Sequence, residues 1–164
     1  AALYANAGDA AARERMAYAA MVSGITLAQV GLGSVHGLAA PLGAFFPIPH
    51  GVACGTLVAT ATRINIEALR ARASDHPALD KYAQVGRLLV RQGDLSRDEA
   101  HDALVDTLFG WTRALRLPTL DHYGVRAADI PRIVANSRGS SMKTNPVLLD
   151  DAEITAIVAA RLSS

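Results

Sequence analysis

Residues 18–62 read YAAMVSGITLAQVGLGSVHGLAAPLGAFFPIPHGVACGTLVATAT, and this stretch of the 164-residue chain contains no Asp, Glu, Lys or Arg. All 16 basic and 15 acidic side chains of the sequence lie outside it. A segment of this length without charge favours burial, because ionised side chains are seldom buried unless they are paired. We therefore expect residues 18–62 to form the middle of a protein core.

The composition of the whole chain excludes several classes of protein. Because 51% of its residues are apolar and its formal net charge is +1, it is not a disordered chain, and nothing suggests a nucleic-acid partner. A single cysteine, Cys54, rules out a disulfide framework and a zinc cluster made of cysteines, and we expect it to pack in the core. The length suits one domain over residues 1–164. No signal peptide is visible, so we expect a cytoplasmic protein.

The uncharged stretch also raises the question of a membrane. A spanning helix needs roughly 20 consecutive apolar residues, whereas residues 18–62 are interrupted by prolines, glycines and two histidines. Lipid tolerates broken helices only where other protein covers them. We therefore expect a buried helical core and no membrane partner, with a membrane-embedded hairpin from residues 18–62 as the less favoured alternative.

Almost every segment of the chain predicts a helix, and none shows the alternating pattern of a strand. We expect an all-α domain of seven to nine helices, some of them short. Gly24 should interrupt the first long helix, and Pro41 with Gly43 should end a later one. Capping signals at the start of helices are Asp9, Ser96 with Glu99, and Asp150 with Glu153. The longest helix should run from Pro49 to about residue 72.

The chain has five histidines, two of which fall in the uncharged stretch. His76, His101 and His122 lie among charged residues, and we expect them to be solvated at the surface. His36 and His50 lie among apolar residues, where each imidazole needs partners for two ring nitrogens. The residues alone leave two interpretations open: core histidines bonded to backbone carbonyls, or a pair of metal ligands or a general base.

The spacing of His36 and His50 permits them to meet. Fourteen residues on one straight helix would separate them by nearly four turns, but the prolines and glycines between them allow the chain to fold back. His50 follows Pro49 in the first turn of a helix, where proline is favoured. Two histidines do not complete a catalytic metal site, which usually has three protein ligands. Either the chain binds no metal, or the other ligands lie outside it.

Two motifs resemble the signature of a known family. Residues 31–43, GLGSVHGLAAPLG, and residues 48–53, IPHGVA, resemble the two-histidine signature of the iron-containing alcohol dehydrogenases, which is roughly GLGxxHxxAHxLG followed by PHGxA. Asn65, Tyr82 and Asn145 stand in segments that match the family in order and spacing. The likeness covers nearly the whole chain.

The resemblance implies a fold and a ligand set. The family joins an N-terminal α/β domain, which binds NAD or NADP, to an all-helical C-terminal domain of the dehydroquinate-synthase-like type, and this sequence resembles only the second. It implies that His36 and His50 are metal ligands for Fe²⁺, or for Zn²⁺ in some members. The remaining ligands, an aspartate and a histidine, would belong to a helix that precedes Ala1. No catalytic or nucleotide-binding residue is implied within the chain.

The activity that the resemblance implies is the interconversion of a small-molecule alcohol and an aldehyde or ketone. Because the resemblance covers neither the nucleotide-binding domain nor two of the four metal ligands, and the chain begins without Met, we expect a fragment that alone is inactive and binds metal weakly. We also expect a homo-oligomer, formed through the apolar surface that the missing domain would cover.

One residue departs from the family pattern. Ala40 stands where the family often has a second histidine implicated in proton relay. This departure and the missing ligands motivate an alternative function, a non-catalytic helical scaffold or interaction domain with a vestigial metal site.

Overall fold

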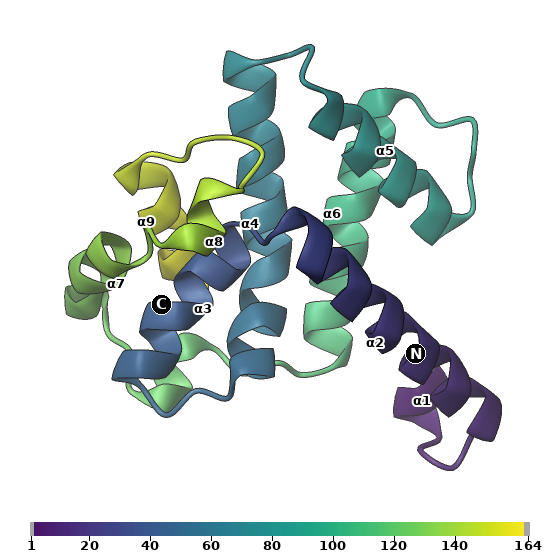
Figure 1. Ribbon diagram of the computed structural model, residues 1–164, viewed down its shortest axis with the longest axis horizontal. Coiled ribbons are helices and arrows are strands. Elements are labelled where there is room, and N and C mark those ends of the chain that lie inside the picture. Colours follow the sequence, from purple (N-terminus) through teal and green to yellow (C-terminus); the bar gives the residue numbers. More distant parts are fainter. Residues whose placement is uncertain (1, 163–164) are drawn as a thin grey trace. The chain divides into compact units, whose positions relative to one another are not determined.

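The computed structural model describes residues 2–162, and these residues form helices and no strand (Figure 1). This confirms the predicted all-α fold. The chain divides into two compact units, the first ending at Leu32 and the second beginning at Gly33. The uncharged stretch therefore contributes to both units.

The first unit consists of α1 (Ala2–Ala5) and α2 (Ala10–Val30). Asp9 caps α2 as predicted, because its carboxylate accepts a hydrogen bond from the backbone N–H of Ala12 at 3.0 Å. The predicted interruption at Gly24 is wrong, since α2 continues through it. A glycine destabilises a helix interior by about 1 kcal/mol relative to alanine but removes no backbone hydrogen bond.

The apolar side chains of α2 are exposed. The prediction that the uncharged stretch is buried throughout is wrong for this helix, in which Ala12 is the one buried residue. Tyr18, Met21, Ile25 and Val30 are each between 56% and 70% exposed. The uncharged part of α2, residues 18–30, therefore forms an apolar surface rather than a core.

No single described helix is long and apolar enough to span a membrane. Only α2 and α3 (Ser34–Phe45), taken together across the break between them, satisfy the requirements of length and composition.

The second unit is built around α4 (His50–Arg72), whose bounds match the prediction. Its buried residues lie on several sides of the helix, so it needs neighbours on several sides. The helices that contact α4 are α3, α5 (Pro77–Val90), α6 (Arg97–Ala114) and α9 (Asp151–Ala159). The shorter elements are η1 (Leu120–Tyr123), η2 (Ala127–Asp129), α7 (Ile130–Asn136) and α8 (Ser140–Lys143).

The helix α3 extends beyond its predicted end, with Pro41 inside it. A proline in a helix interior costs about 3 kcal/mol or more, and the complete burial of Leu38 and Leu42 in the core offsets this cost. The helix ends at Phe45, and the next residue, Phe46, precedes Pro47 and is extended (φ −135°, ψ 152°). This is the conformation that a following proline favours.

The predicted capping boxes at the start of α6 and α9 both form. One prediction about the histidines is wrong, because His101 is 1% exposed. Its Nε2 lies 2.7 Å from the carbonyl oxygen of Leu79, and its Nδ1 lies 2.9 Å from the guanidinium of Arg70. Since a carbonyl only accepts and a guanidinium only donates, Nε2 carries the proton and Nδ1 accepts. His76 caps α5, and His122 is exposed.

Candidate metal centre

The two histidines of the uncharged stretch meet at the start of α3 and α4. His36 is the third residue of α3, and His50 is the first residue of α4. The chain between them folds back through residues 46–49, and the ring centroids lie 5.3 Å apart with the planes at 50°. The spacing of the two histidines in the sequence permitted this proximity. The metal-binding role of the pair stays a prediction.

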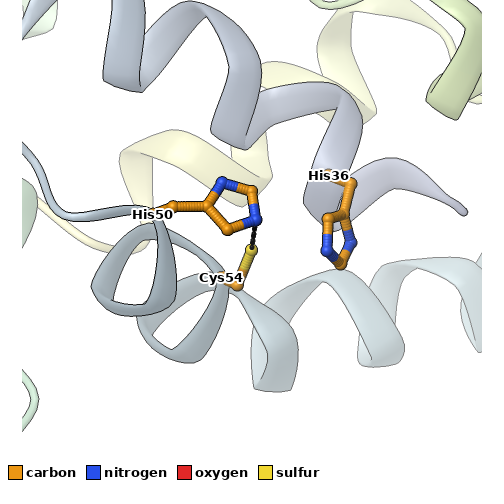
Figure 2. Close-up of side chains that lie close together, drawn as sticks. All are labelled: His36, His50 and Cys54. Atoms are coloured by element: carbon orange, nitrogen blue, oxygen red, sulfur yellow. Dashed lines mark hydrogen bonds between the residues drawn. The ribbon is translucent and has the colours of Figure 1, made fainter. Parts of the chain in front are cut away.

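A third side chain, Cys54 of α4, lies beside this pair (Figure 2). Its Sγ is 3.5 Å from Nε2 of His50, and one donor atom from each of His36, His50 and Cys54 lies within 4.8 Å of the others. We expected Cys54 inside the core, but it is half-buried at the core's edge. The four-residue spacing from His50 is the signal that could have identified it, because residues four apart share a helix face.

Burial shifts the pKa values of two groups in this cluster. Burial, and then the neighbouring His50, lower the pKa of His36, because both disfavour the imidazolium form. Burial raises the pKa of the Cys54 thiol. His36 is therefore held in the neutral form, which is the form of histidine that binds metals.

A network of side-chain amides holds the first turn of α3. Oδ1 of Asn145 accepts a hydrogen bond from the backbone N–H of Ser34 at 3.0 Å and another from Nδ2 of Asn65 at 3.2 Å. Nδ2 of Asn145 donates to Oδ1 of Asn65 and to the carbonyl of Val147, each at 2.8 Å. Because Ser34 lies two residues before His36, this network fixes the helix end that carries the histidine.

A cleft of about 480 Å³ lies between this network and the cluster, with His36, Cys54, Asn65, Tyr82 and Asn145 among its lining residues. Asn65 donates a hydrogen bond to the Tyr82 hydroxyl at 3.4 Å. Burial raises the pKa of Tyr82, and this hydrogen bond partly offsets the effect, so the phenol is protonated at neutral pH. The volume suits a small molecule.

The donor set fits the metals that the family resemblance implied. Imidazole nitrogens suit Fe²⁺ and Zn²⁺ alike. Within residues 2–162, the cluster of His36, His50 and Cys54 is the one group of three or more His, Cys, Asp or Glu side chains close enough to share an ion. The meeting of these side chains beside a cleft therefore marks the candidate metal centre.

A family model described as "Fe-containing alcohol dehydrogenase family, C-terminal" matches residues 1–162. The chain belongs to this family. It is 38% identical over 129 residues to lactaldehyde reductase of Escherichia coli (strain K12), a match that covers 77% of this chain and 31% of that protein. It is 29% identical over 119 residues to the NADPH-dependent butanol dehydrogenase of Clostridium saccharobutylicum, covering 72% of this chain and 28% of that protein.

The structural comparison gives the same family. The crystal structure of a 1,3-propanediol oxidoreductase matches with a TM-score of 0.83 and 27% identity, covering 98% of this chain and 40% of the other. The chain thus spans about a third of the length of these curated relatives. These matches confirm the predicted fold, the all-helical C-terminal domain of an iron-containing alcohol dehydrogenase.

Three residues from segments that resembled this family meet in the cleft, namely Asn65, Tyr82 and Asn145. Their order and spacing were visible in the sequence, but their contact was not, because they lie 17 and 80 residues apart along the chain. Their hydrogen bonds explain how distant segments position the helix that carries His36.

Proposed function

We propose that this chain is the metal-binding part of an NAD(P)-dependent alcohol dehydrogenase that interconverts an alcohol and an aldehyde or ketone. The observation that carries the proposal is the meeting of His36 and His50 beside a cleft, in a chain of the Fe-containing alcohol dehydrogenase family. The names of the relatives refer to lactaldehyde, butanol and 1,3-propanediol, which supports a small alcohol or aldehyde as substrate.

In this proposal, His36 and His50 hold an Fe²⁺ or Zn²⁺ ion. When bound, the ion would polarise the oxygen of the alcohol or carbonyl group and stabilise the negative charge that develops there. His36 is presented from a helix end that Asn145 holds through Ser34, and burial keeps its imidazole neutral. His50 is placed by the first turn of α4, in which the backbone N–H of Val52 bonds the carbonyl of Pro49.

Two tasks of the reaction fall to other groups. NAD or NADP would be held mainly by a nucleotide-binding domain outside residues 1–164, as in the family. Ala40 carries no titratable group, so proton transfer in this protein does not use the position at which the family often has a histidine. The substrate range of this protein therefore need not match that of members with the second histidine.

The metal site is tested by binding measurements on the 164-residue chain. We expect His36→Ala and His50→Ala each to weaken Fe²⁺ and Zn²⁺ binding by at least about 100-fold in isothermal titration, because losing a ligand costs more than losing an outer-shell partner. His122 is an exposed histidine that is not part of the cluster, so His122→Ala serves as the matched control and should bind as the parent chain does. Unchanged affinity in the double variant His36→Ala/His50→Ala would overturn the assignment.

The activity is tested on the complete gene product that contains this chain. Alcohol-dependent reduction of NAD⁺ or NADP⁺ should depend on His36 and His50, and the 164-residue chain alone should show none. A complete protein that binds the metal but oxidises no alcohol and reduces no aldehyde would favour the scaffold function instead.

We also propose that the chain self-associates through the exposed apolar side chains of α2. Ile25 and Val30, which are 59% and 70% exposed, are suitable positions for a test. Light scattering should show oligomers that dissociate in the variant Ile25→Lys/Val30→Lys, because a buried lysine pair is costly at an interface. A monodisperse monomer of the parent chain at high concentration would contradict this expectation.

A further inference from the structure

The cluster at the start of α3 and α4 contains one more donor than the proposed pair of histidines. Sγ of Cys54 lies 3.5 Å from Nε2 of His50, and the donor atoms of all three residues lie within 4.8 Å of one another. Figure 2 shows His50 and Cys54 projecting from successive turns of α4 on the side where His36 approaches from α3. The thiol of the chain's single cysteine therefore lies beside both imidazoles.

These distances are close to those of a tetrahedral coordination sphere. With Zn–N bonds of about 2.0–2.1 Å and a Zn–S bond of about 2.3 Å, tetrahedral angles place a ligating nitrogen and sulfur about 3.6 Å apart. The pair of His50 and Cys54 already has this separation, at 3.5 Å. The widest pair, at no more than 4.8 Å, needs to close by roughly 1–1.5 Å to reach the same geometry.

The backbone under all three side chains is held firmly. In α4, Ala53 and Leu57 are completely buried, and the hydroxyl of Thr56 donates to the carbonyl of Pro118 at 2.9 Å. In α3, the N–H of Ser34 is held by Asn145. Rotation of the side chains alone can therefore close the cluster around an ion, as a site built on rigid helices requires.

We propose that Cys54 is a third metal ligand, giving a two-histidine, one-cysteine donor set that prefers Zn²⁺ to Fe²⁺. This rests on the proposed site at His36 and His50 and adds a ligand to it. On binding, the S–H bond breaks, the proton passes to solvent and a sulfur–metal bond forms, with no transfer of electrons. A thiolate is a soft ligand that suits Zn²⁺, and Zn²⁺ stands above Fe²⁺ in the general order of affinities. Residues 1–164 would then supply three of the ion's ligands, and the aspartate and histidine that the family resemblance implies outside the chain would complete its coordination.

Cobalt reports the thiolate directly, because a Co²⁺–thiolate bond absorbs strongly in the near ultraviolet by charge transfer and imidazole ligands do not produce this band. We expect the band when the 164-residue chain is titrated with Co²⁺, and its loss in Cys54→Ser. The same substitution should weaken Zn²⁺ binding by about 100-fold or more and Fe²⁺ binding by less. His122→Ala should retain the band, and circular dichroism verifies that each variant is folded.

A second readout needs no variant of the cysteine. Because Cys54 is the only thiol of the chain, its rate of modification by a thiol reagent reports on this residue alone. Zn²⁺ should slow the modification at least tenfold in the parent chain, and it should give no protection in His36→Ala/His50→Ala. This measurement tests whether Cys54 binds the ion even if Cys54→Ser fails to fold.

The outcomes separate this proposal from the metal site on which it rests. Co²⁺ binding without a charge-transfer band, with equal Zn²⁺ affinity in Cys54→Ser, would refute the role of Cys54 and leave the histidine pair standing. If the parent chain binds none of the three metals, both proposals are wrong. A thiolate band that survives in His36→Ala/His50→Ala would place the ion elsewhere and would also overturn the three-residue site.

Discussion

Replacing Asn145 by alanine should destabilise the end of α3 that carries His36. The Asn145 amide takes part in four hydrogen bonds, with Ser34, Val147 and both polar atoms of the Asn65 side chain. The bond to Ser34 satisfies one of the backbone N–H groups that a helix leaves unpaired at its N-terminus. Asn145→Ala removes all four bonds and supplies no replacement.

The magnitude follows from the groups that lose a partner. Ser34 and Asn65 are buried, at 1% and 6% exposed, so the N–H of Ser34 and Oδ1 of Asn65 lose their partners in the interior. Each buried polar group left without a partner costs about 1–3 kcal/mol. The neighbouring cleft gives water some access, so we expect a total loss of about 2–4 kcal/mol. For a chain of this length that corresponds to a fall in Tm of roughly 5–15 °C.

Thermal and urea unfolding, followed by circular dichroism, measure this loss. Asn136→Ala is the matched control, because Asn136 is exposed and its amide bonds only a carbonyl of its own helix, so its cost should stay within about 0.5 kcal/mol. The double variant Asn65→Ala/Asn145→Ala should cost less than the sum of the single variants, since the two residues share bonds. A loss below about 0.5 kcal/mol in Asn145→Ala, or strict additivity, would refute the reasoning.

Three further predictions concern the second unit. Gly86→Ala should destabilise the chain by about 3 kcal/mol in thermal unfolding, because the new Cβ would lie 1.9 Å from the carbonyl oxygen of Ala100, and an unchanged Tm would disprove the close approach of α5 and α6. Thr60→Val should stabilise it by about 1 kcal/mol, since the buried Thr60 hydroxyl has no partner among the described residues, and a loss of stability would contradict this. Hydrogen bonds from Ser96 lower the pKa of Glu99. The ionised carboxylate therefore stabilises the folded chain at pH values above the usual pKa of glutamate, and this stabilisation is lost as the pH falls through the lowered pKa. Urea midpoints between about pH 3 and 6 should therefore fall more steeply with acid in the parent than in Glu99→Gln.

The helix starts and the central helix could be predicted because their signals are local. Asp9 and the pair of Ser96 and Glu99 bond backbone groups within three residues of themselves, so sequence neighbours alone determine these caps. The burial of His101 could not be predicted in this way. Its partners, Arg70 and Leu79, lie 31 and 22 residues away, and only the packing of α6 against both α4 and α5 brings them together.

Two residues that often break helices, Pro41 and Gly24, gave wrong predictions of helix ends. Pro41 lies inside α3 because Leu38 and Leu42 bury themselves in the core on the same helix. Gly24 lies inside α2, where no positive φ or close approach requires a glycine. A proline or glycine predicts a helix end only when continuing the helix past it would not stabilise the fold.

The absence of charge from residues 18–62 has a consequence for the metal centre. Two imidazoles are neutral ligands, so on their own they leave the full charge of a divalent ion in a partly buried place, which is costly. None of the residues that line the cleft in the described part of the chain is acidic. Cys54 is therefore the one residue of the cluster that can bring a negative charge to the ion, as a thiolate. Because this segment has no acidic residue, its single cysteine is the one donor within the described residues that can add a negative charge beside His36 and His50.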